Sequence, residues 1–308
     1  MDDVKLRAYF EETAKKRGIS FELFERFKSD TVTSDGLRLH LDVIEVNRGR
    51  PTVVFVPGTS VYALIYVEFM TALADKGYNV VGFDPRGHGR SEGVRGSYTI
   101  PELVADTKAV VDYTRNRYGD PIAVAGSSQG GIVAFYYAAS GDPVAGVICH
   151  NVADLGDPSS VRLTRTPGFS RMMKPLLKIF GSLLPELKIP VSLYLDLEAE
   201  KMKGFGNGKA FLEQDPLALK YICLKALASL ASEKLPRPVE QITTPVLILH
   251  AGHDNIFPLD YVENIYNRLT CKKSLKVYKD LPHLILTENV DLVIPDVVKW
   301  LEDICKKS

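Results

Sequence analysis

The residues best suited to chemistry stand at positions 126–130, where the chain reads Gly-Ser-Ser-Gln-Gly. A short apolar run at 122–125 predicts a buried strand before them, and the apolar stretch 129–139 predicts a helix after them. Such a sharp turn strains its central residue and needs small neighbours, because strand and helix nearly touch there. The pattern predicts a nucleophile elbow that holds the Ser128 hydroxyl above the positive end of a helix, where developing negative charge is stabilised. Ser127 is expected to be a small packing residue.

A serine hydroxyl is a weak nucleophile at neutral pH unless a base accepts its proton. An imidazole in that role needs a carboxylate to fix its tautomer and stabilise its cation. In sheets that carry a nucleophile elbow, the acid and then the histidine follow the serine along the chain. Asp254 follows a predicted strand at 245–250, and His283 follows one at 274–278. Because ligand chemistry in open α/β sheets gathers at the carboxyl ends of the strands, Ser128, Asp254 and His283 can converge as a catalytic triad.

Other residues compete for these roles. His253 is the nearest rival base, although the adjacent Asp254 would struggle to orient it, and Asp280 is the second candidate acid. His150 and His250 end predicted strands, so we expect them to border the site as partly buried side chains with satisfied hydrogen bonds.

The tetrahedral oxygen of an acyl-transfer reaction needs two backbone donors, one of them from the residue after the nucleophile. Gln129 is that residue. The second donor comes from the loop after an earlier strand, and Thr59 is our candidate because it follows Pro57 and Gly58, where glycine allows close backbone approach. The predicted chemistry calls for no metal and no cofactor.

The elements that must position these residues alternate along the chain. Alternating apolar and polar residues at 31–44, around a Ser-Asp-Gly turn, predict an antiparallel hairpin. Continuously apolar runs typical of strands buried on both faces occur at 52–56, 79–83, 144–150 and 245–250. Predicted helices lie between and after the strands, including 101–118, 259–269 and 290–305. This order predicts an α/β fold, with a mostly parallel, doubly wound sheet and right-handed crossovers.

The alternation lapses between residues 151 and 241, where helical patterns dominate and apolar residues recur at steps of three and four, as at Met172, Leu176 and Phe180. We expect an inserted helical cap at 151–241. Its apolar stripe is interpreted as core, as the lining of an acyl-chain tunnel or as a lipid-contacting surface. The remaining organisation is a helical leader at 1–28 and a catalytic core at 29–150 and 242–308.

Three further stretches carry a resemblance to a known family: Asp-Pro-Arg-Gly-His-Gly-Arg-Ser at 84–91, Gly-His-Asp at 252–254 and Pro-His at 282–283. With the elbow, they make the sequence resemble the α/β-hydrolase superfamily, in particular its bacterial lysophospholipase and monoacylglycerol-lipase-like esterases, over roughly residues 31–306. The resemblance implies the α/β-hydrolase fold and makes Asp84 and His88 scaffold residues.

The chain departs from that family at the oxyanion turn, where members commonly carry His-Gly and this sequence has Pro57 and Gly58. The departure bears on loop geometry more than on activity, because the donor is a backbone amide further on. Serine at position 128 also argues against the epoxide hydrolase and haloalkane dehalogenase branches, which the resemblance would otherwise admit.

Composition excludes several other function classes. The chain has 308 residues with 38 basic and 38 acidic side chains, so no excess charge points to nucleic acid or to an anionic membrane. No apolar run reaches the roughly 18 to 20 residues of a bilayer span, and the charged N-terminus lacks a secretory signal, so a cytoplasmic location is expected. The four cysteines are widely scattered and are expected to be free thiols.

The expected function is hydrolysis of a carboxylic ester through an acyl-enzyme on Ser128. The apolar cap favours a small-molecule substrate with a medium or long acyl chain, such as a monoacylglycerol or a lysophospholipid. A thioesterase, peptidase or acyltransferase would use the same triad and stays open. So does a protein that binds a small apolar ligand on this scaffold without turning it over. The sequence does not define the oligomeric state.

Overall fold

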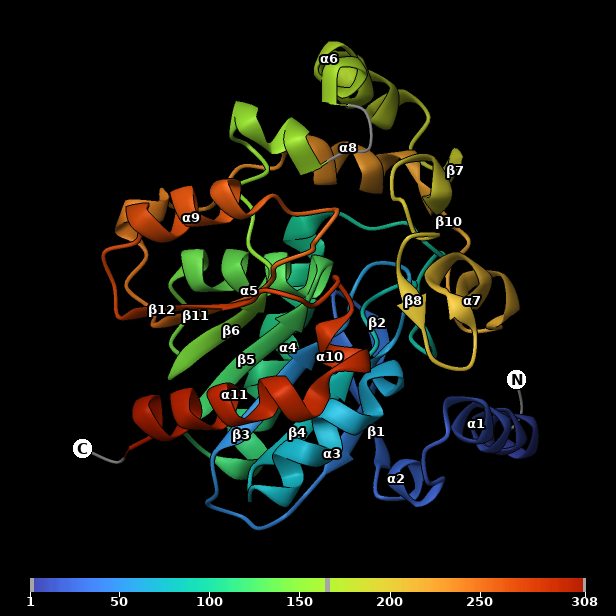
Figure 1. Cartoon of the computed structure of the whole chain (residues 1–308), viewed down its shortest axis with the longest axis vertical. Coiled ribbons are helices and arrows are strands. Elements are labelled where there is room, and N and C mark those ends of the chain that lie inside the picture. The colour runs from blue at the N-terminus through green and yellow to red at the C-terminus, as the bar shows by residue number, and fades with distance from the viewer. Residues whose placement is uncertain (1–2, 164–166, 307–308) are drawn as a thin grey trace.

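An eight-stranded sheet runs through the centre of the protein in the order β1-β2-β4-β3-β5-β6-β11-β12 (Figure 1). The computed structural model describes residues 3–163 and 167–306. The strands are β1 (Lys28–Ser34), β2 (Leu37–Ile44), β3 (Thr52–Val56), β4 (Asn79–Phe83), β5 (Ile122–Ser127), β6 (Gly146–His150), β11 (Val246–Ala251) and β12 (Lys273–Tyr278). The pairs β1–β2 and β2–β4 are antiparallel, and the other pairs are parallel. The expected α/β fold with a mostly parallel sheet and an N-terminal hairpin is confirmed.

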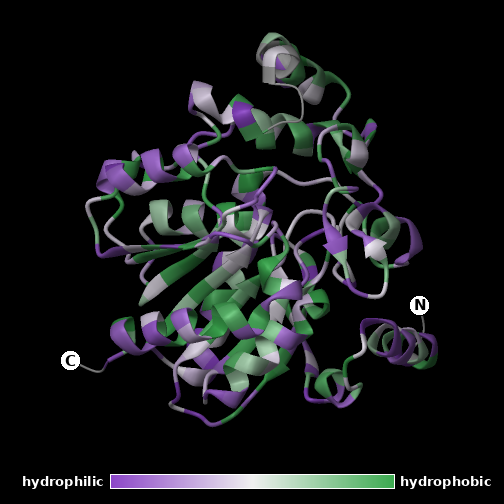
Figure 2. Cartoon of the chain, in the orientation of Figure 1, coloured by the Kyte–Doolittle hydropathy of each residue, from purple (hydrophilic) through white to green (hydrophobic). Residues whose placement is uncertain are grey.

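Every residue of β3, β4, β5, β6 and β11 is buried, as their uninterrupted apolar sequences predict. Helix α3 (Val67–Asp75) packs with α11 (Val290–Ile304), and α4 (Ile100–Tyr118) packs with α5 (Gln129–Ser140). The pair α3 and α11 lies in front of the sheet in Figure 1, and α4 lies behind it. Helix α9 (Leu259–Arg268) follows β11 along the chain. Hydrophobic residues are concentrated in the central strands of the sheet (Figure 2).

The leader forms two helices, α1 (Asp3–Arg17) and α2 (Glu22–Glu25), which pack on the core. The ring of Phe10 stacks on that of Phe24 at 5.1 Å between centroids. The buried guanidinium of Arg17 donates to the carbonyl oxygens of Ile65 and Thr287 at 2.9 and 3.0 Å. The C-terminal end of α1 is therefore fixed to the core.

Residues 151–241, which we call the cap segment, are less purely helical than expected. Their helices are η2 (Pro158–Leu163), α6 (Pro167–Leu183), η3 (Val191–Leu193), α7 (Gly208–Gln214), α8 (Leu224–Ser232) and η4 (Val239–Gln241). The structure adds two small antiparallel sheets, one of β7 (Lys188–Pro190) with β10 (Tyr221–Cys223) and one of β8 (Lys201–Met202) with β9 (Gly206–Asn207). Strands of two or three residues carry too little alternation to be predicted, and residues 164–166 of the predicted cap lie outside the described residues.

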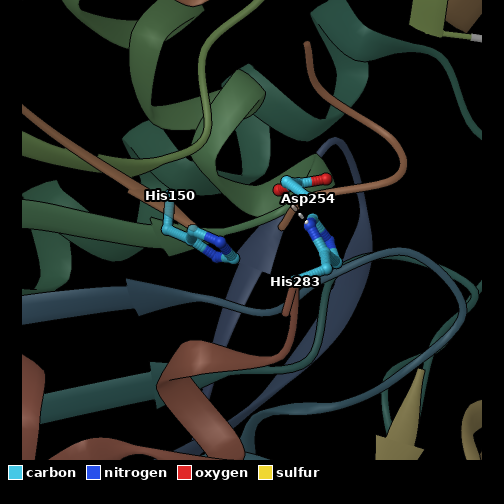
Figure 3. Close-up of side chains that lie close together, drawn as sticks. All are labelled: His150, Asp254 and His283. Atoms are coloured by element: carbon cyan, nitrogen blue, oxygen red, sulfur yellow. Dashed lines mark hydrogen bonds and ion pairs between the residues drawn. The ribbon is translucent and has the colours of Figure 1, made fainter. Parts of the chain in front are cut away.

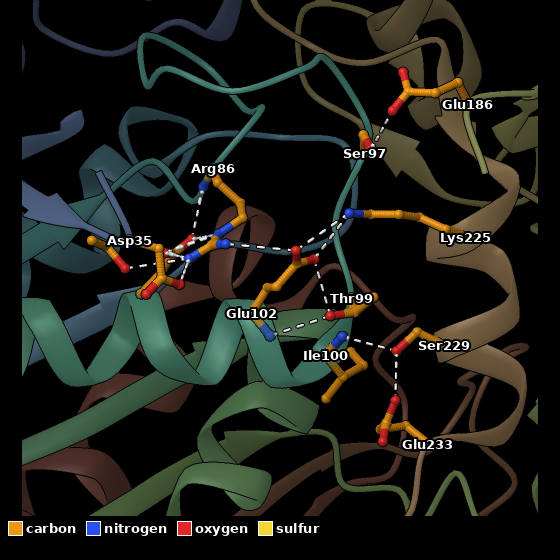
Figure 4. A network of polar contacts seen from close by, with 12 residues as sticks. Asp35, Arg86, Ser97, Thr99, Ile100, Glu102, Glu186, Lys225, Ser229 and Glu233 are labelled. Atoms are coloured by element: carbon orange, nitrogen blue, oxygen red, sulfur yellow. Dashed lines mark hydrogen bonds and ion pairs between the residues drawn. The ribbon is translucent and has the colours of Figure 1, made fainter. Parts of the chain in front are cut away.

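Polar contacts fix α8 of the cap segment to the start of α4 in the core (Figure 4). The ammonium of Lys225 lies 3.3 Å from the Glu102 carboxylate, and the backbone N–H of Ile100 donates to the Ser229 hydroxyl at 2.9 Å. That hydroxyl donates in turn to Glu233 at 3.0 Å. From these contacts we propose that residues 151–241 act as one cap on a core formed by 29–150 and 242–308, with the leader at 1–28 packed beside it.

The apolar stripe on α6 is mostly at the surface. Met172, Leu176, Phe180 and Leu183 are exposed, whereas Leu177 lines a cavity. Of the interpretations left open for this stripe, core packing therefore fits the described side chains least well.

No described helix combines the length and the apolar composition that crossing a bilayer requires. The four cysteines are free thiols, as expected, with Cys149 and Cys223 buried and Cys271 and Cys305 partly buried.

Candidate active site

Ser128 sits at the turn between β5 and α5 with φ 53° and ψ −117°, a conformation that L-residues rarely adopt. Glycines on both sides make this turn possible. A Cβ on Gly126 would lie 2.0 Å from the carbonyl oxygen of Gly130, and a Cβ on Gly130 would lie 2.1 Å from that of Val56. The strand, turn and helix of the predicted nucleophile elbow are therefore present, with strain at its central residue.

Asp254 and His283 lie together at the carboxyl ends of β11 and β12 (Figure 3). The Nδ1 of His283 is 2.7 Å from the Oδ2 of Asp254. The other oxygen, Oδ1, accepts backbone N–H groups from Ile256 at 2.8 Å and Phe257 at 2.9 Å. The ring of Phe257 lies nearly parallel to the imidazole. The carboxylate is thus held by the loop after β11 and in turn orients the histidine, which leaves Nε2 as the ring nitrogen available to the substrate side.

Burial and charge act in opposite directions on this pair. Burial alone would raise the pKa of Asp254, but the charge and hydrogen bond of His283 outweigh it, and the pKa of the carboxyl is lowered. Burial alone would lower the pKa of His283, but the carboxylates of Asp254 and Glu200 outweigh it, and the pKa of the imidazole is raised. Asp254 therefore stays ionised at neutral pH, and His283 is a stronger base than an ordinary histidine.

Ser128 and His283 do not yet form the predicted contact. Ser128 is half-buried and lines a cavity, whereas His283 is only 3% exposed. Within the described residues, no hydrogen bond joins the hydroxyl of Ser128 to the imidazole. Catalytic hydrogen bonds in ligand-free structures are often long and tighten only when substrate binds.

The rival residues lie elsewhere. His253 and Asp280 are both exposed on the loops that bear Asp254 and His283. Neither belongs to the buried pair of Asp254 and His283. The structure therefore does not favour His253 as the base or Asp280 as the acid.

His150 and His250 are more buried than expected, each only 1% exposed. The Nδ1 of His250 lies 2.9 Å from the Oδ1 of Asn151. The ring of His150 points toward His283 (Figure 3) with 4.9 Å between centroids. Its Nε2 is buried without a partner, so the expectation of satisfied hydrogen bonds is wrong for this residue. Burial and the nearby positive charge of His283 hold the pKa of His150 well below 6.5, so its ring is neutral.

Asn151 is a functional candidate that the sequence did not reveal. Its Nδ2 donates to the Oδ2 of Asp254 at 2.8 Å, the same oxygen that contacts His283. The available signal was its position directly after the strand β6, at the same edge of the sheet as the predicted triad.

Thr59 and Gln129 both line the cavity beside Ser128. A Cβ on Gly58 would lie 3.6 Å from the Cβ of Ser128, so the turn that carries Thr59 packs against the elbow. The Tyr98 hydroxyl donates to the side-chain oxygen of Gln129 at 3.0 Å and fixes that side chain. The two residues expected to supply the oxyanion hole therefore flank the nucleophile.

The cavity has a volume of about 360 Å³ and is mostly apolar. The core supplies Thr59, Ser128, Gln129, Ile132, Ile256 and Phe257, and the cap segment supplies Leu155, Ser160, Val161, Leu163, Lys174, Leu177, Ile189, Leu193, Tyr194, Leu195, Leu227, Leu230 and Ala231. Lys174 is the charged residue among them, and its ammonium donates to the carbonyl of Leu155 at 3.2 Å. A pocket with an apolar body and a nucleophile at its wall suits an acyl chain.

Within the described part of the chain, one group of side chains is close enough to hold a metal ion. The ligand atoms of His150, Asp254 and His283 lie within 4.8 Å of one another. However, the Asp254 carboxylate already accepts four hydrogen bonds, from His283, Asn151, Ile256 and Phe257. A carboxylate this fully bonded is built to orient a histidine rather than to bind a cation.

Comparison with known proteins identifies the family of the chain. A family model described as "Serine aminopeptidase, S33" and named Hydrolase_4 matches residues 47–290, most of the chain. The chain belongs to this Hydrolase_4 family. Its resemblance to the α/β hydrolases, and in particular to monoacylglycerol-lipase-like members, is confirmed.

The chain is similar to enzymes whose names describe different reactions. A monoacylglycerol lipase from Mycolicibacterium smegmatis is 28% identical over 277 residues, which cover 86% of this chain and 93% of the relative. A non-heme chloroperoxidase from Burkholderia pyrrocinia is 25% identical over 245 residues, which cover 76% and 85%. The family match and the monoacylglycerol lipase relative are consistent with an ester hydrolase, and the different names of the relatives leave the substrate open.

A solved monoglyceride lipase from Saccharomyces cerevisiae, in complex with a substrate analogue, aligns with a TM-score of 0.73 at 20% identity and covers 92% of this chain and 96% of its own. The monoacylglycerol lipase of Paleococcus ferrophilus aligns with a TM-score of 0.68 at 24% identity and covers 87% and 99%. At this level of identity the two structures establish the shared fold.

Proposed function

We propose that this protein hydrolyses carboxylic esters through an acyl-enzyme on Ser128. The observation that carries the proposal is the elbow serine at the wall of a mostly apolar cavity. The same cavity is lined by Phe257, whose ring stacks on His283 of the buried pair with Asp254. The complete pair favours catalysis over binding without turnover, because a protein that only binds a ligand does not need an oriented, ionised buttress for its histidine.

In the proposed reaction, Nε2 of His283 removes the proton of the Ser128 hydroxyl as its oxygen attacks the acyl carbon. The backbone N–H groups of Gln129 and Thr59 stabilise the oxyanion. The histidine then gives its proton to the departing alcohol, and a water molecule, activated by the same imidazole, releases the carboxylic acid. Asp254 stays ionised throughout and stabilises the imidazolium.

We propose a medium or long acyl chain in an ester of a small polar alcohol, such as a monoacylglycerol or a lysophospholipid. The apolar lining supports the acyl part, and a monoacylglycerol lipase among the relatives supports the alcohol part. The cavity lining contains no carboxylate among the described residues, which disfavours an aminopeptidase because such an enzyme must bind a substrate ammonium. A thioesterase or an acyltransferase would use the same groups. A thioesterase is distinguished by its thiol leaving group, and an acyltransferase by an acceptor other than water.

The test is intact-mass analysis after incubation with a fluorophosphonate, followed by peptide mapping. We expect one adduct on Ser128, with no adduct in Ser128→Ala and strongly slowed labelling in His283→Ala. Hydrolysis of p-nitrophenyl esters from acetyl to palmitoyl then tests the acyl assignment. Labelling with a sharp preference for acetyl would overturn the long-chain assignment alone, whereas no labelling of folded protein would overturn the acyl-enzyme.

A further inference from the structure

Glu200 carries an unusual carboxyl group in the cap segment, directly before β8. The residue is 0% exposed, and neither of its buried carboxyl oxygens makes a hydrogen bond of regular geometry to a described residue. An ionised carboxylate in such a place is costly unless a nearby positive charge compensates it. A buried carboxyl group without a regular hydrogen bond is therefore a reason to ask which neighbouring group it serves.

The nearest titratable groups belong to the candidate active site. The carboxyl of Glu200 lies against the backbone of His283 and the side chain of Asn255. Burial raises the pKa of Glu200, and the positive charge of His283 opposes that rise. The effect is mutual, since the Glu200 carboxylate raises the pKa of His283. The titratable groups that act on the imidazole are Asp254 from the loop after β11, His150 from the end of β6, His250 from β11 and Glu200 from the cap segment.

Tight packing holds Glu200 in this place. Its carbonyl oxygen accepts the backbone N–H of Gly208 at 2.8 Å, at the start of α7. In the adjoining β8–β9 hairpin, a Cβ on Gly204 would meet the carbonyl oxygen of Lys16 at 2.5 Å, so the hairpin lies directly on the end of α1. The backbone N–H of Lys203 donates to Glu288 at 3.1 Å, five residues beyond the histidine. The hairpin is therefore fixed to the leader and to the segment that follows His283.

We propose that Glu200 is a positioning residue for the reaction, a second carboxyl group that the cap segment places beside His283 to stabilise its imidazolium form. This inference rests on the proposed function, because it assigns Glu200 a role in the step in which His283 accepts the proton of Ser128. In that step the proton moves from the serine oxygen to Nε2 and later to the alcohol. Glu200 exchanges no atoms and acts only through its charge. The basicity of the histidine then depends on the cap segment as well as on Asp254.

The test compares Glu200→Gln with wild type and with Glu198→Gln as a matched control. Glu198 lies two residues away on the same segment, but its side chain is 63% exposed and pairs with Lys209. The readout is the rate of fluorophosphonate labelling of Ser128 as a function of pH, which requires no knowledge of the natural substrate. The same pH dependence is then measured for the hydrolysis of p-nitrophenyl butyrate.

Removing the negative charge of Glu200 lowers the pKa of His283, so the imidazole becomes neutral at lower pH. We therefore expect the midpoint of the acid limb to move to lower pH in Glu200→Gln, and the plateau rate to fall about threefold to tenfold. Glu198→Gln should match wild type in both respects. A purely structural role of Glu200 would change neither the midpoint nor, in folded protein, the labelling rate.

An unchanged midpoint and plateau in Glu200→Gln would overturn the inference while leaving the proposed function intact. Failure of wild type to label at Ser128 would overturn the proposed function, and the inference with it. If Glu200→Gln does not fold, Glu200→Asp provides the test, because it keeps the charge but withdraws the carboxyl by one methylene. Its midpoint should fall below that of wild type, and a midpoint equal to that of wild type would count against the inference.

Discussion

The Nδ2 of Asn151 lies 2.8 Å from the Oδ2 of Asp254 and donates a hydrogen bond to it. The same oxygen contacts His283, while the other carboxylate oxygen accepts two backbone N–H groups. The side-chain oxygen of Asn151 faces His250, which fixes the amide. A chain of hydrogen bonds therefore runs from His250 through Asn151 and Asp254 to His283, and Asn151 supports the orientation of the proposed base through Asp254.

Replacing Asn151 with alanine should remove one donor from a buried carboxylate. We expect the free energy of unfolding to fall by about 2 kcal/mol and kcat/KM for a p-nitrophenyl ester to fall roughly tenfold, because a charged acceptor loses a partner. Urea unfolding and steady-state kinetics measure the two effects. Asn267→Ala, an exposed asparagine on α9, is the control. Equal behaviour of the two variants would mean that Asn151 does not support Asp254.

The pH dependence of kcat/KM should report His283. The base must be neutral to accept a proton, and its pKa is raised, so activity should rise with pH through a midpoint above the ordinary histidine value of about 6.5. His150 should not contribute to this limb, because its pKa is lowered and it is neutral throughout. A midpoint below the ordinary value would show that burial, not the carboxylates, dominates at His283.

Asp254→Asn should lower kcat/KM by about a thousandfold or more, because an amide no longer fixes the tautomer or stabilises the imidazolium. The acid stability should change as well. The pKa of Asp254 is lowered in the folded state, so its contribution to stability is present above the unfolded value of about 3.9 and is lost as pH falls below it. Guanidinium unfolding between pH 2 and 7 should therefore show a smaller loss of stability in acid for the variant than for wild type.

The leader, the core and the cap segment meet at one carboxylate. The hydroxyls of Tyr9 and Tyr62 both donate to the Oδ2 of the buried Asp215. Tyr9→Phe removes one of these donors while the other remains, so thermal unfolding should show a loss of about 1–2 kcal/mol. Tyr221→Phe, at an exposed position of the cap segment, is the control and should be neutral. No difference between the two variants would mean that α1 does not fix the cap segment through Tyr9.

The parts of this site that could be predicted follow from local patterns. Ser128 lies between a fully buried strand and an apolar helix, and both leave a clear sequence signal. Asp254 could be found because it follows the fully buried strand β11, and His283 because it follows β12, which is partly buried along its length. Asn151 can support Asp254 because β6 pairs with β11, although the whole cap segment separates these strands in the sequence. No local sequence pattern predicts which distant strands will pair. Glu200 lies beside two-residue strands, where there is no periodicity to interpret.

The elbow should tolerate no side chain at Gly126. A Cβ there would lie 2.0 Å from the carbonyl oxygen of Gly130, which is backbone and can move away only if α5 shifts. Gly126→Ala should therefore lower the free energy of unfolding by about 2–3 kcal/mol and displace Ser128 enough to abolish labelling by a fluorophosphonate. Gly208→Ala is the matched control, because its nearest contact would be 3.4 Å, an ordinary separation. If Gly126→Ala is still labelled, the turn can accommodate a Cβ at position 126 without displacing Ser128. The steric argument for glycine at this position would then be wrong.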